Sequence, residues 1–161
     1  MKVDVTLLKA DIEYELEKLE KVYNEFLPLK NKLSQSDDEV TTYDKAVVGY
    51  LLHSFYNGCE NIFRSIARFF ENSVSTRTWH KDLLKKMTLE IEGVRPRVIS
   101  KELYLLLDDF RGFRHKFRHS YSFELDWERE KVVARKFDKA LKMLKREIRE
   151  FLESLNSMID D

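Results

Sequence analysis

The chain has 161 residues and a net charge of zero, with 43% apolar and 36% charged residues. This length suits one domain with a full core, and the composition is that of a soluble globular protein, not a disordered one. Four glycines and two prolines are too few for a turn-rich β fold, and one cysteine excludes an internal disulfide framework.

We therefore expect a single domain over residues 1–161, in a reducing, cytoplasmic environment. The N-terminus carries acidic residues where a signal peptide needs an apolar run. No stretch approaches the roughly 20 apolar residues that span a bilayer, so no membrane association is expected.

Helical periodicity predicts an all-α chain. Residues 3–33 carry apolar side chains at steps of three and four, and Pro28 is expected to kink or end the regular part. A second helix is expected to begin at Thr41 or Thr42, whose hydroxyl can cap the first turn, and to run to about Glu71. Each helix has one long apolar face for a shared core.

Three further helices complete the prediction. A short one is expected over residues 79–91, with Trp79 pointing inward, before a connector that Pro96 keeps from being helical. Ser100 is expected to cap a fourth helix, and Asp126 a last helix of about 30 residues. The predicted architecture is an up-and-down bundle of four long helices plus a short one.

The charges are distributed unevenly. Residues 1–40 hold six lysines and ten acidic residues, a net charge of −4, whereas residues 110–123 hold four fixed cations, two histidines and no acid. A neutral chain with one focused basic stretch suits a site for an anion better than a broad surface that follows nucleic-acid phosphates. The basic side chains of this stretch are Arg111, Arg114, His115, Lys116, Arg118 and His119.

Arg114 is the unusual residue of the basic stretch. It follows Leu107 by seven residues and Phe110 by four, so it projects from the apolar face of the fourth helix. Because a buried unpaired charge is costly, Arg114 must meet an anionic partner or line a cleft. His119, at the end of this helix, can carry a proton near neutral pH. The bare spacing Arg114-x4-His119 is a weak signal, since chance produces it in many sequences.

Other chemistry is disfavoured by the residues present. His115 and His119 have the spacing of a helical metal site, but a catalytic metal needs about three protein ligands and the nearby groups are mostly cations. No phosphate-binding glycine loop, nucleophile signature or dinucleotide fingerprint is present, so we expect neither metal nor cofactor. Glu60, Arg64 and Arg68, at four-residue spacing, are expected to form a ladder on the protein surface.

The amino-acid sequence around these residues resembles one protein family. Arg114-His-Lys-Phe-Arg-His-Ser-Tyr121 resembles the R-x(4–6)-H signature of HEPN domains, and the chain more specifically resembles HepT-like ribonuclease toxins. Tyr56-Asn-Gly-Cys-Glu belongs to the first of several further matching stretches, and the resemblance extends over about residues 42–158. The matching stretches are 56–68, 79–84, 93–96 and 113–129.

The resemblance implies a HEPN-type helical bundle that forms a homodimer and brings two copies of the motif to one cleft. It implies metal-independent cleavage of RNA, with Arg114 and His119 as catalytic residues. For HepT toxins it also implies a minimal nucleotidyltransferase antitoxin, which adenylylates the motif tyrosine, here Tyr121. Secondary contacts to RNA phosphates are expected from His115, Lys116, Arg118 and Arg111.

The residue types fit this chemistry. RNA supplies its own nucleophile, the 2′-hydroxyl, so the protein needs to add a base, an acid and charge stabilisation. The imidazole of His119 suits either proton role, and the guanidinium of Arg114 can stabilise the charge that grows on the phosphate. Because one imidazole cannot be base and acid at once, a dimer with two copies of His119 could supply both groups. The alternative is a non-catalytic HEPN module that binds a nucleotidyltransferase partner or a nucleotide through the same basic cleft.

Overall fold

The computed structural model describes residues 2–71 and 79–160, and these are helical apart from turns and one isolated bridge, between Ile91 and Arg95. Four long helices form the bundle, namely α1 (Lys2–Phe26), α2 (Thr42–Glu71), α4 (Lys101–Arg118) and α6 (Phe137–Asp160). The shorter elements are α3 (Trp79–Lys86), α5 (Trp127–Ala134) and two 3₁₀ segments, η1 (Leu27–Ser34) and η2 (Ser122–Glu124).

These elements confirm the prediction of an all-α bundle with four long helices. Residues 72–78 lie outside the described part, as does the side chain of Trp79, which was expected to point inward. Within the described part, no helix is long and apolar enough to cross a bilayer.

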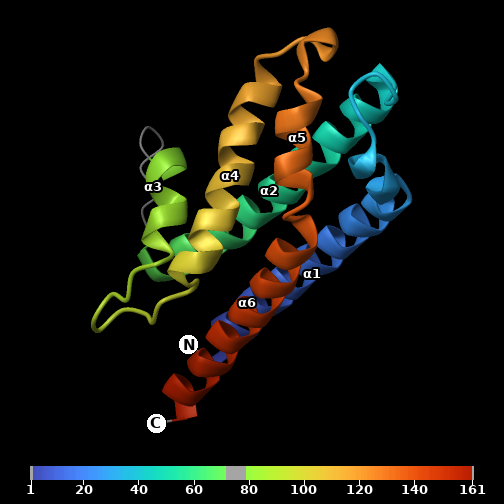
Figure 1. Ribbon diagram of the computed structural model, residues 1–161. Coiled ribbons are helices and arrows are strands. Elements are labelled where there is room, and N and C mark those ends of the chain that lie inside the picture. The colour runs from blue at the N-terminus through green and yellow to red at the C-terminus, as the bar shows by residue number, and fades with distance from the viewer. Residues whose placement is uncertain (1, 72–78, 161) are drawn as a thin grey trace.

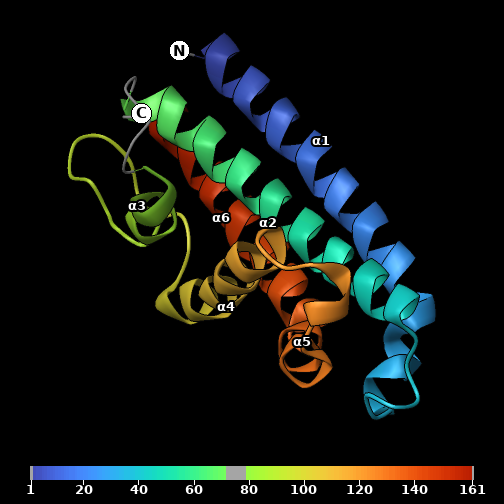
Figure 2. The ribbon, with the colours of Figure 1, turned by 90° about the horizontal axis from the view of Figure 1, so that it is seen from above.

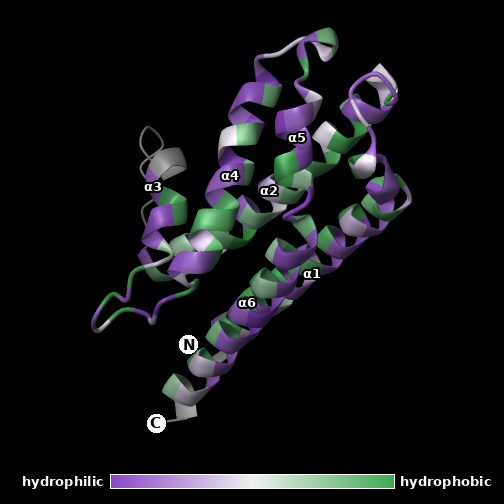
Figure 3. Cartoon of the chain, in the orientation of Figure 1, coloured by the Kyte–Doolittle hydropathy of each residue, from purple (hydrophilic) through white to green (hydrophobic). Residues whose placement is uncertain are grey.

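Helix α2 is the element on which the others pack. It lies antiparallel to α1 and contacts α3, α4 and α5 along its length (Figures 1 and 2). Helix α6 returns beside α1, so both chain ends lie at one end of the molecule, whereas the C-terminal end of α4 and η2 lie at the other (Figure 1). Aromatic rings fill the centre, where Phe55, Phe110 and Phe137 are fully buried and contact one another. Many of the residues of α4 towards its C-terminal end are hydrophilic (Figure 3).

Local sequence signals place most helix boundaries as predicted. The hydroxyl of Thr41 accepts a hydrogen bond from the amide of Asp44 at 3.1 Å at the start of α2. Ser100 caps α4 by accepting from the amide of Leu103 at 3.1 Å. The regular part of the first helix ends before Pro28, which lies in the first turn of η1. These starts and stops are confirmed because each depends only on a neighbouring side chain or ring.

The expected single last helix is wrong, because the chain bends between α5 and α6. Asp126 does cap this segment, but only α5 follows it directly. At the bend, Arg135 donates a side-chain hydrogen bond to the carbonyl of Leu33 at 2.9 Å, and Lys136 pairs with Asp109 at 2.6 Å. Contacts with distant parts of the chain hold this bend.

Helix α3 also ends at Lys86, short of the expected residue 91. The backbone of Ile91 pairs with that of Arg95 instead, around Gly93, whose φ of 76° suits a residue without a side chain. The buried guanidinium of Arg95 donates to the carbonyls of Lys86 and Leu89 at 3.0 and 2.9 Å. The arginine therefore occupies backbone acceptors at the end of α3.

A close approach of α1 to α2 depends on Gly58, because a Cβ added there would overlap the fully packed side chain of Leu19. We expect Gly58→Ala to lower the free energy of unfolding by about 1–3 kcal/mol. Gly112→Ala is the matched control, since a Cβ on Gly112 meets nothing within 4 Å on the exposed face of α4. That change should raise stability by up to about 1 kcal/mol. Urea denaturation of both variants measures the difference, and equal effects would contradict the packing argument.

Candidate functional site

Arg114 extends from α4 towards α2 and forms a buried ion pair with Glu60. Its Nη1 lies 2.6 Å from Oε2 of Glu60, and its Nη2 donates to Oε1 at 2.8 Å. Nη1 also donates to Oδ1 of Asn57 at 3.1 Å, and the guanidinium lies 4.7 Å from the centroid of the Tyr56 ring. The expectation that Arg114 must meet an anionic partner or a cleft is confirmed by Glu60.

The surface ladder expected from Glu60, Arg64 and Arg68 is wrong for its first member. Glu60 is only 4% exposed and turns to α4, while Arg64 lies 3.9 Å from its carboxylate. Asn57 and His53 also lie at this contact, although neither was predicted as a site residue. A signal for them was present, because positions 53, 57 and 60 follow one another at helical spacing along a single side of α2.

His53 is half-buried beside the α2–α4 contact. Its Nδ1 lies 3.2 Å from Nδ2 of Asn57, and its Nε2 lies 3.3 Å from Nε of Arg118. The ring packs against those of Phe117 and Tyr50. Burial, followed by the charges of Arg118 and Arg114, lowers the pKa of His53 below its ordinary value of 6.5. His53 is therefore neutral at pH 7.

The neighbouring side of α4 carries His115 and His119, whose ring centroids are 5.0 Å apart. Both line an open pocket of about 590 Å³, formed with Lys116 of α4 and with residues that follow the helix. The amide of His119 closes α4 by donating to the carbonyl of Lys116. The polar residues contributed by the following segment are Ser120, Glu124, Asp126 and Arg129.

The structure thus divides the predicted residues between two sides of one helix. Arg114 and Arg118, four residues apart, turn to α2, whereas His115 and His119 face the pocket. Among the described residues, no hydrogen bond or ion pair joins Arg114 to His119. Arg111 stays on the surface of α4, where Asp108 binds it at 2.7 Å.

Tyr121 lies just beyond the helix and is 71% exposed. Its ring stacks on that of Phe123, with 5.5 Å between centroids and an angle of 2° between planes. Its amide donates to the carboxylate of Glu124 at 2.8 Å, which holds the turn that leads into η2. The Tyr121 side chain is therefore presented to solvent, and its chain neighbour Ser120 lines the same pocket as His119.

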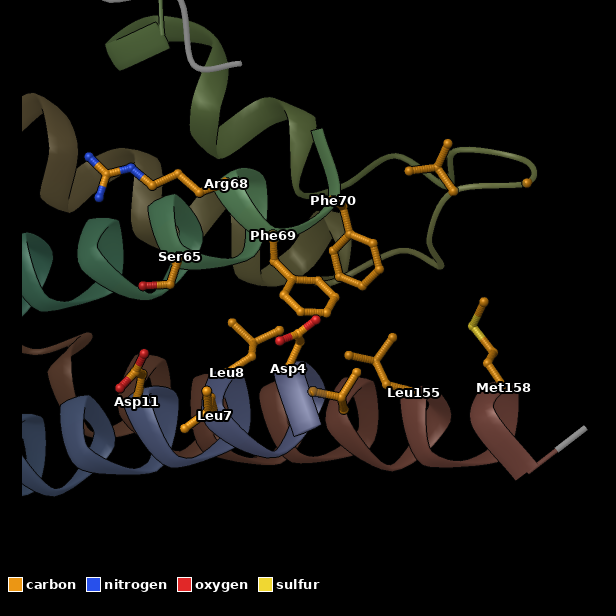
Figure 4. Close-up of a pocket in the computed structure, with 13 residues that line it drawn as sticks. Asp4, Leu7, Leu8, Asp11, Ser65, Arg68, Phe69, Phe70, Leu155 and Met158 are labelled. Atoms are coloured by element: carbon orange, nitrogen blue, oxygen red, sulfur yellow. The ribbon is translucent and has the colours of Figure 1, made fainter. Parts of the chain in front are cut away.

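A second and larger pocket lies at the opposite end, near both chain termini. It measures about 880 Å³ and is lined mainly by apolar side chains of α1, α2 and α6, including Leu8, Phe69 and Leu155 (Figure 4). The larger pocket is lined by Asp4, Asp11 and Arg68 among its charged residues, whereas the pocket at the end of α4 is lined by His115 and His119, so the latter is the better candidate for proton transfer at neutral pH. Within the described part of the chain, no cluster of three or more His, Cys, Asp or Glu side chains is arranged to hold a metal ion.

A buried carboxyl group lies behind the candidate site. Glu130 of α5 is fully buried, and neither of its carboxyl oxygens has a hydrogen-bond partner. It lies near Gly49 of α2, against which the ring of Phe117 packs so closely that an added Cβ would lie 2.8 Å from that ring. Burial raises the pKa of Glu130 from its ordinary 4.5 to about 8, although Lys45 opposes the rise. Glu130 is therefore mostly uncharged at pH 7 and does not neutralise the cations of α4.

The chain is similar to a known protein family. The family model described as HepT-like protein matches residues 47–155, which is more than half of the chain. The chain therefore belongs to the HepT-like family, as the resemblance of its sequence to HepT-like members of the HEPN superfamily predicted. No curated protein and no solved structure matches the chain. The matched region contains α4 and every residue of the site described above.

The ion pair of Arg114 and Glu60 predicts a strong stability effect. Arg114→Ala removes the closest partner of the buried Glu60 carboxylate, so the free energy of unfolding should fall by about 3–5 kcal/mol. The double variant Glu60→Ala/Arg114→Ala should lose less than the sum of the two single changes. Denaturant titrations of the full cycle measure this coupling. His119→Ala serves as an exposed control and should change stability by less than about 0.5 kcal/mol; additive single effects would contradict the pairing.

Glu130 predicts a pH-dependent stability difference. The unfolded carboxyl ionises near its ordinary pKa, whereas the folded one keeps its proton up to about pH 8. Folding must therefore take up a proton between these values, and stability falls as pH rises through this window. Glu130→Gln removes this proton uptake, so the stability of the variant relative to wild type should rise by about 1.4 kcal/mol per pH unit from roughly pH 5 to 7. Urea titrations at several pH values test this; a constant difference would contradict it.

Proposed function

We propose that the protein is a metal-independent endoribonuclease toxin that works as a homodimer. The observation that supports this most is the exposed imidazole of His119, which lines a pocket beside fixed cations at the end of α4 in a HepT-like chain. Arg114 and His119 are the proposed catalytic residues. The proposed contacts to RNA phosphates are His115, Lys116, Arg118 and Arg111.

The proposed reaction uses the 2′-hydroxyl of RNA as the nucleophile. Its oxygen attacks the neighbouring phosphorus, the bond from phosphorus to the 5′-oxygen breaks, and the products are a 2′,3′-cyclic phosphate and a 5′-hydroxyl. One proton leaves the 2′-hydroxyl and one reaches the 5′-oxygen. His119 of one protomer takes the first proton, and the same residue of the second protomer supplies the other. The homodimer therefore provides a base and an acid in one cleft.

Arg114 can take part in catalysis only if it stays paired with Glu60, or if another group takes its place in that pair. Its observed hydrogen bonds and ion pair use Nη1 twice and Nη2 once. A guanidinium has five N–H groups, so donors remain for a phosphate oxygen at the edge of the pair. We propose that Glu60 fixes the guanidinium in place. The remaining N–H groups then donate hydrogen bonds to the phosphate oxygen on which negative charge develops.

Tyr121 is the proposed point of control. Its exposed phenol next to the pocket suits modification by a minimal nucleotidyltransferase antitoxin. An attached nucleotide would place bulk and negative charge beside His119 and repel RNA. The proposed partners are therefore RNA, a second copy of the chain and this antitoxin, with all steps in the cytoplasm.

A second function is supported by the same ion pair. Because Glu60 already neutralises Arg114 in the protomer, the chain could bind a nucleotidyltransferase partner or a nucleotide through its basic cleft without cleaving RNA. Lys116 and Arg118 would then supply the attraction for the anion. The two functions differ in one measurable respect, which is whether the purified protein breaks RNA.

Purified wild-type protein, without partner, should cleave single-stranded RNA in the presence of EDTA. His119→Ala should reduce the rate by at least about 100-fold, because a proton carrier is lost while the fold is kept. His115→Ala is the matched neighbour in the same pocket and should raise KM more than it lowers kcat. Intact RNA with wild type, or equal cleavage by His119→Ala, would reject the enzyme. RNA binding without cleavage would favour the second function.

A further inference from the structure

Four polar side chains form a continuous row between α2 and α4. Arg114 donates to Oδ1 of Asn57 at 3.1 Å, Nδ2 of Asn57 lies 3.2 Å from Nδ1 of His53, and Nε2 of His53 lies 3.3 Å from Nε of Arg118. Each end of the row is an arginine. Arginine side chains donate hydrogen bonds and accept none.

The donors of this row outnumber its acceptors. Since Arg114 needs the oxygen of Asn57, the amide nitrogen of Asn57 must face His53 as a donor. Nδ1 of His53 must then be the bare acceptor, and a neutral imidazole carries its one hydrogen on the other nitrogen. Nε2–H of His53 therefore faces Nε–H of Arg118, with two donors and no acceptor between them.

The mismatch falls at the solvent end of the row. The contact between His53 and Arg118 is the longest of the three and the only exposed one. The inner end is fixed, because Arg114 is buried and held by Glu60. Arg118 is exposed, and among the described side chains no carboxylate pairs with it.

We propose that Nε2–H of His53 and the guanidinium of Arg118 form a binding site for a phosphate group. An oxygen of the phosphate accepts from both donors, which removes the mismatch and pairs the charge of Arg118. Water could also accept both hydrogens, but it would leave the cation unpaired. The ring of Phe117 closes one side of the site by packing against His53. Naming RNA as the source of the phosphate rests on the proposed function, whereas the site itself does not.

The state of His53 supports this assignment. Burial and the charges of Arg118 and Arg114 keep the imidazole neutral, and Glu60 opposes them only weakly as the last of the four influences. A phosphate that accepts from Nε2–H leaves Nδ1 bare, so the hydrogen bond that Nδ1 accepts from Asn57 is kept.

Imidazole ¹⁵N NMR of the full chain tests the site directly. At pH 7 we expect His53 to carry its proton on Nε2, with Nδ1 bare. Addition of inorganic phosphate should shift the Nε2 signal of His53, with a smaller shift at Nδ1. Arg118→Gln should weaken phosphate binding about tenfold or more, the loss expected for a charged hydrogen bond. Arg146→Gln, the same change at an exposed arginine on α6, should leave binding unchanged.

The outcomes separate the site from the proposed function. A proton on Nδ1 of His53, or His53 signals that ignore phosphate, would overturn the site. A single-stranded DNA decamer lacks the 2′-hydroxyl and cannot be cleaved, so its binding reports the site alone. Shifts at His53 with both probes support a nucleic-acid phosphate, and shifts with inorganic phosphate only would overturn RNA as the source. If both probes bind normally but RNA stays intact, the nuclease proposal fails while the phosphate site stands.

Discussion

The buried pair of Arg114 and Glu60 sets how α4 lies against α2. Both charges are withdrawn from water, so moving them apart is costly and the face that α4 turns to α2 is fixed. The other positions at this end follow from that rotation. Arg118, one turn further along, meets His53, while His119 turns towards the segment that leads through η2 to α5.

The sequence predicts one half of this pair and not the other. Helical phase places Arg114 on an apolar stripe and so requires a partner, which is a local argument. The identity of that partner depends on the register between α2 and α4, where Glu60 lies 54 residues away along the chain. A local alternative, the spacing of Glu60 to Arg64, made the acid look like a surface residue. His53 and Asn57 were missed for the same reason, since their roles arise only from contact with α4.

The helix boundaries divide in the same way. Ser100 and Pro28 act through their own backbone neighbourhood, so the sequence is sufficient to predict them. No proline or glycine marks the bend between α5 and α6, which depends on bonds from Arg135 and Lys136 to distant residues. The family resemblance supplied the motif residues of the site, but not their division between two sides of α4.

The charges at the end of α4 support the proposal that an anion from another molecule binds there. The nearby carboxylates are already engaged. Glu60 binds Arg114, and Asp108 binds Arg111. Glu124 accepts from the amide of Tyr121, and Asp126 pairs with Arg129. The buried Glu130 carries little charge at neutral pH. Among the described residues, this leaves the cations of Lys116 and Arg118 without an acidic partner. Cations at a helix end whose neighbouring acids are already paired suit the proposed binding of a negatively charged molecule.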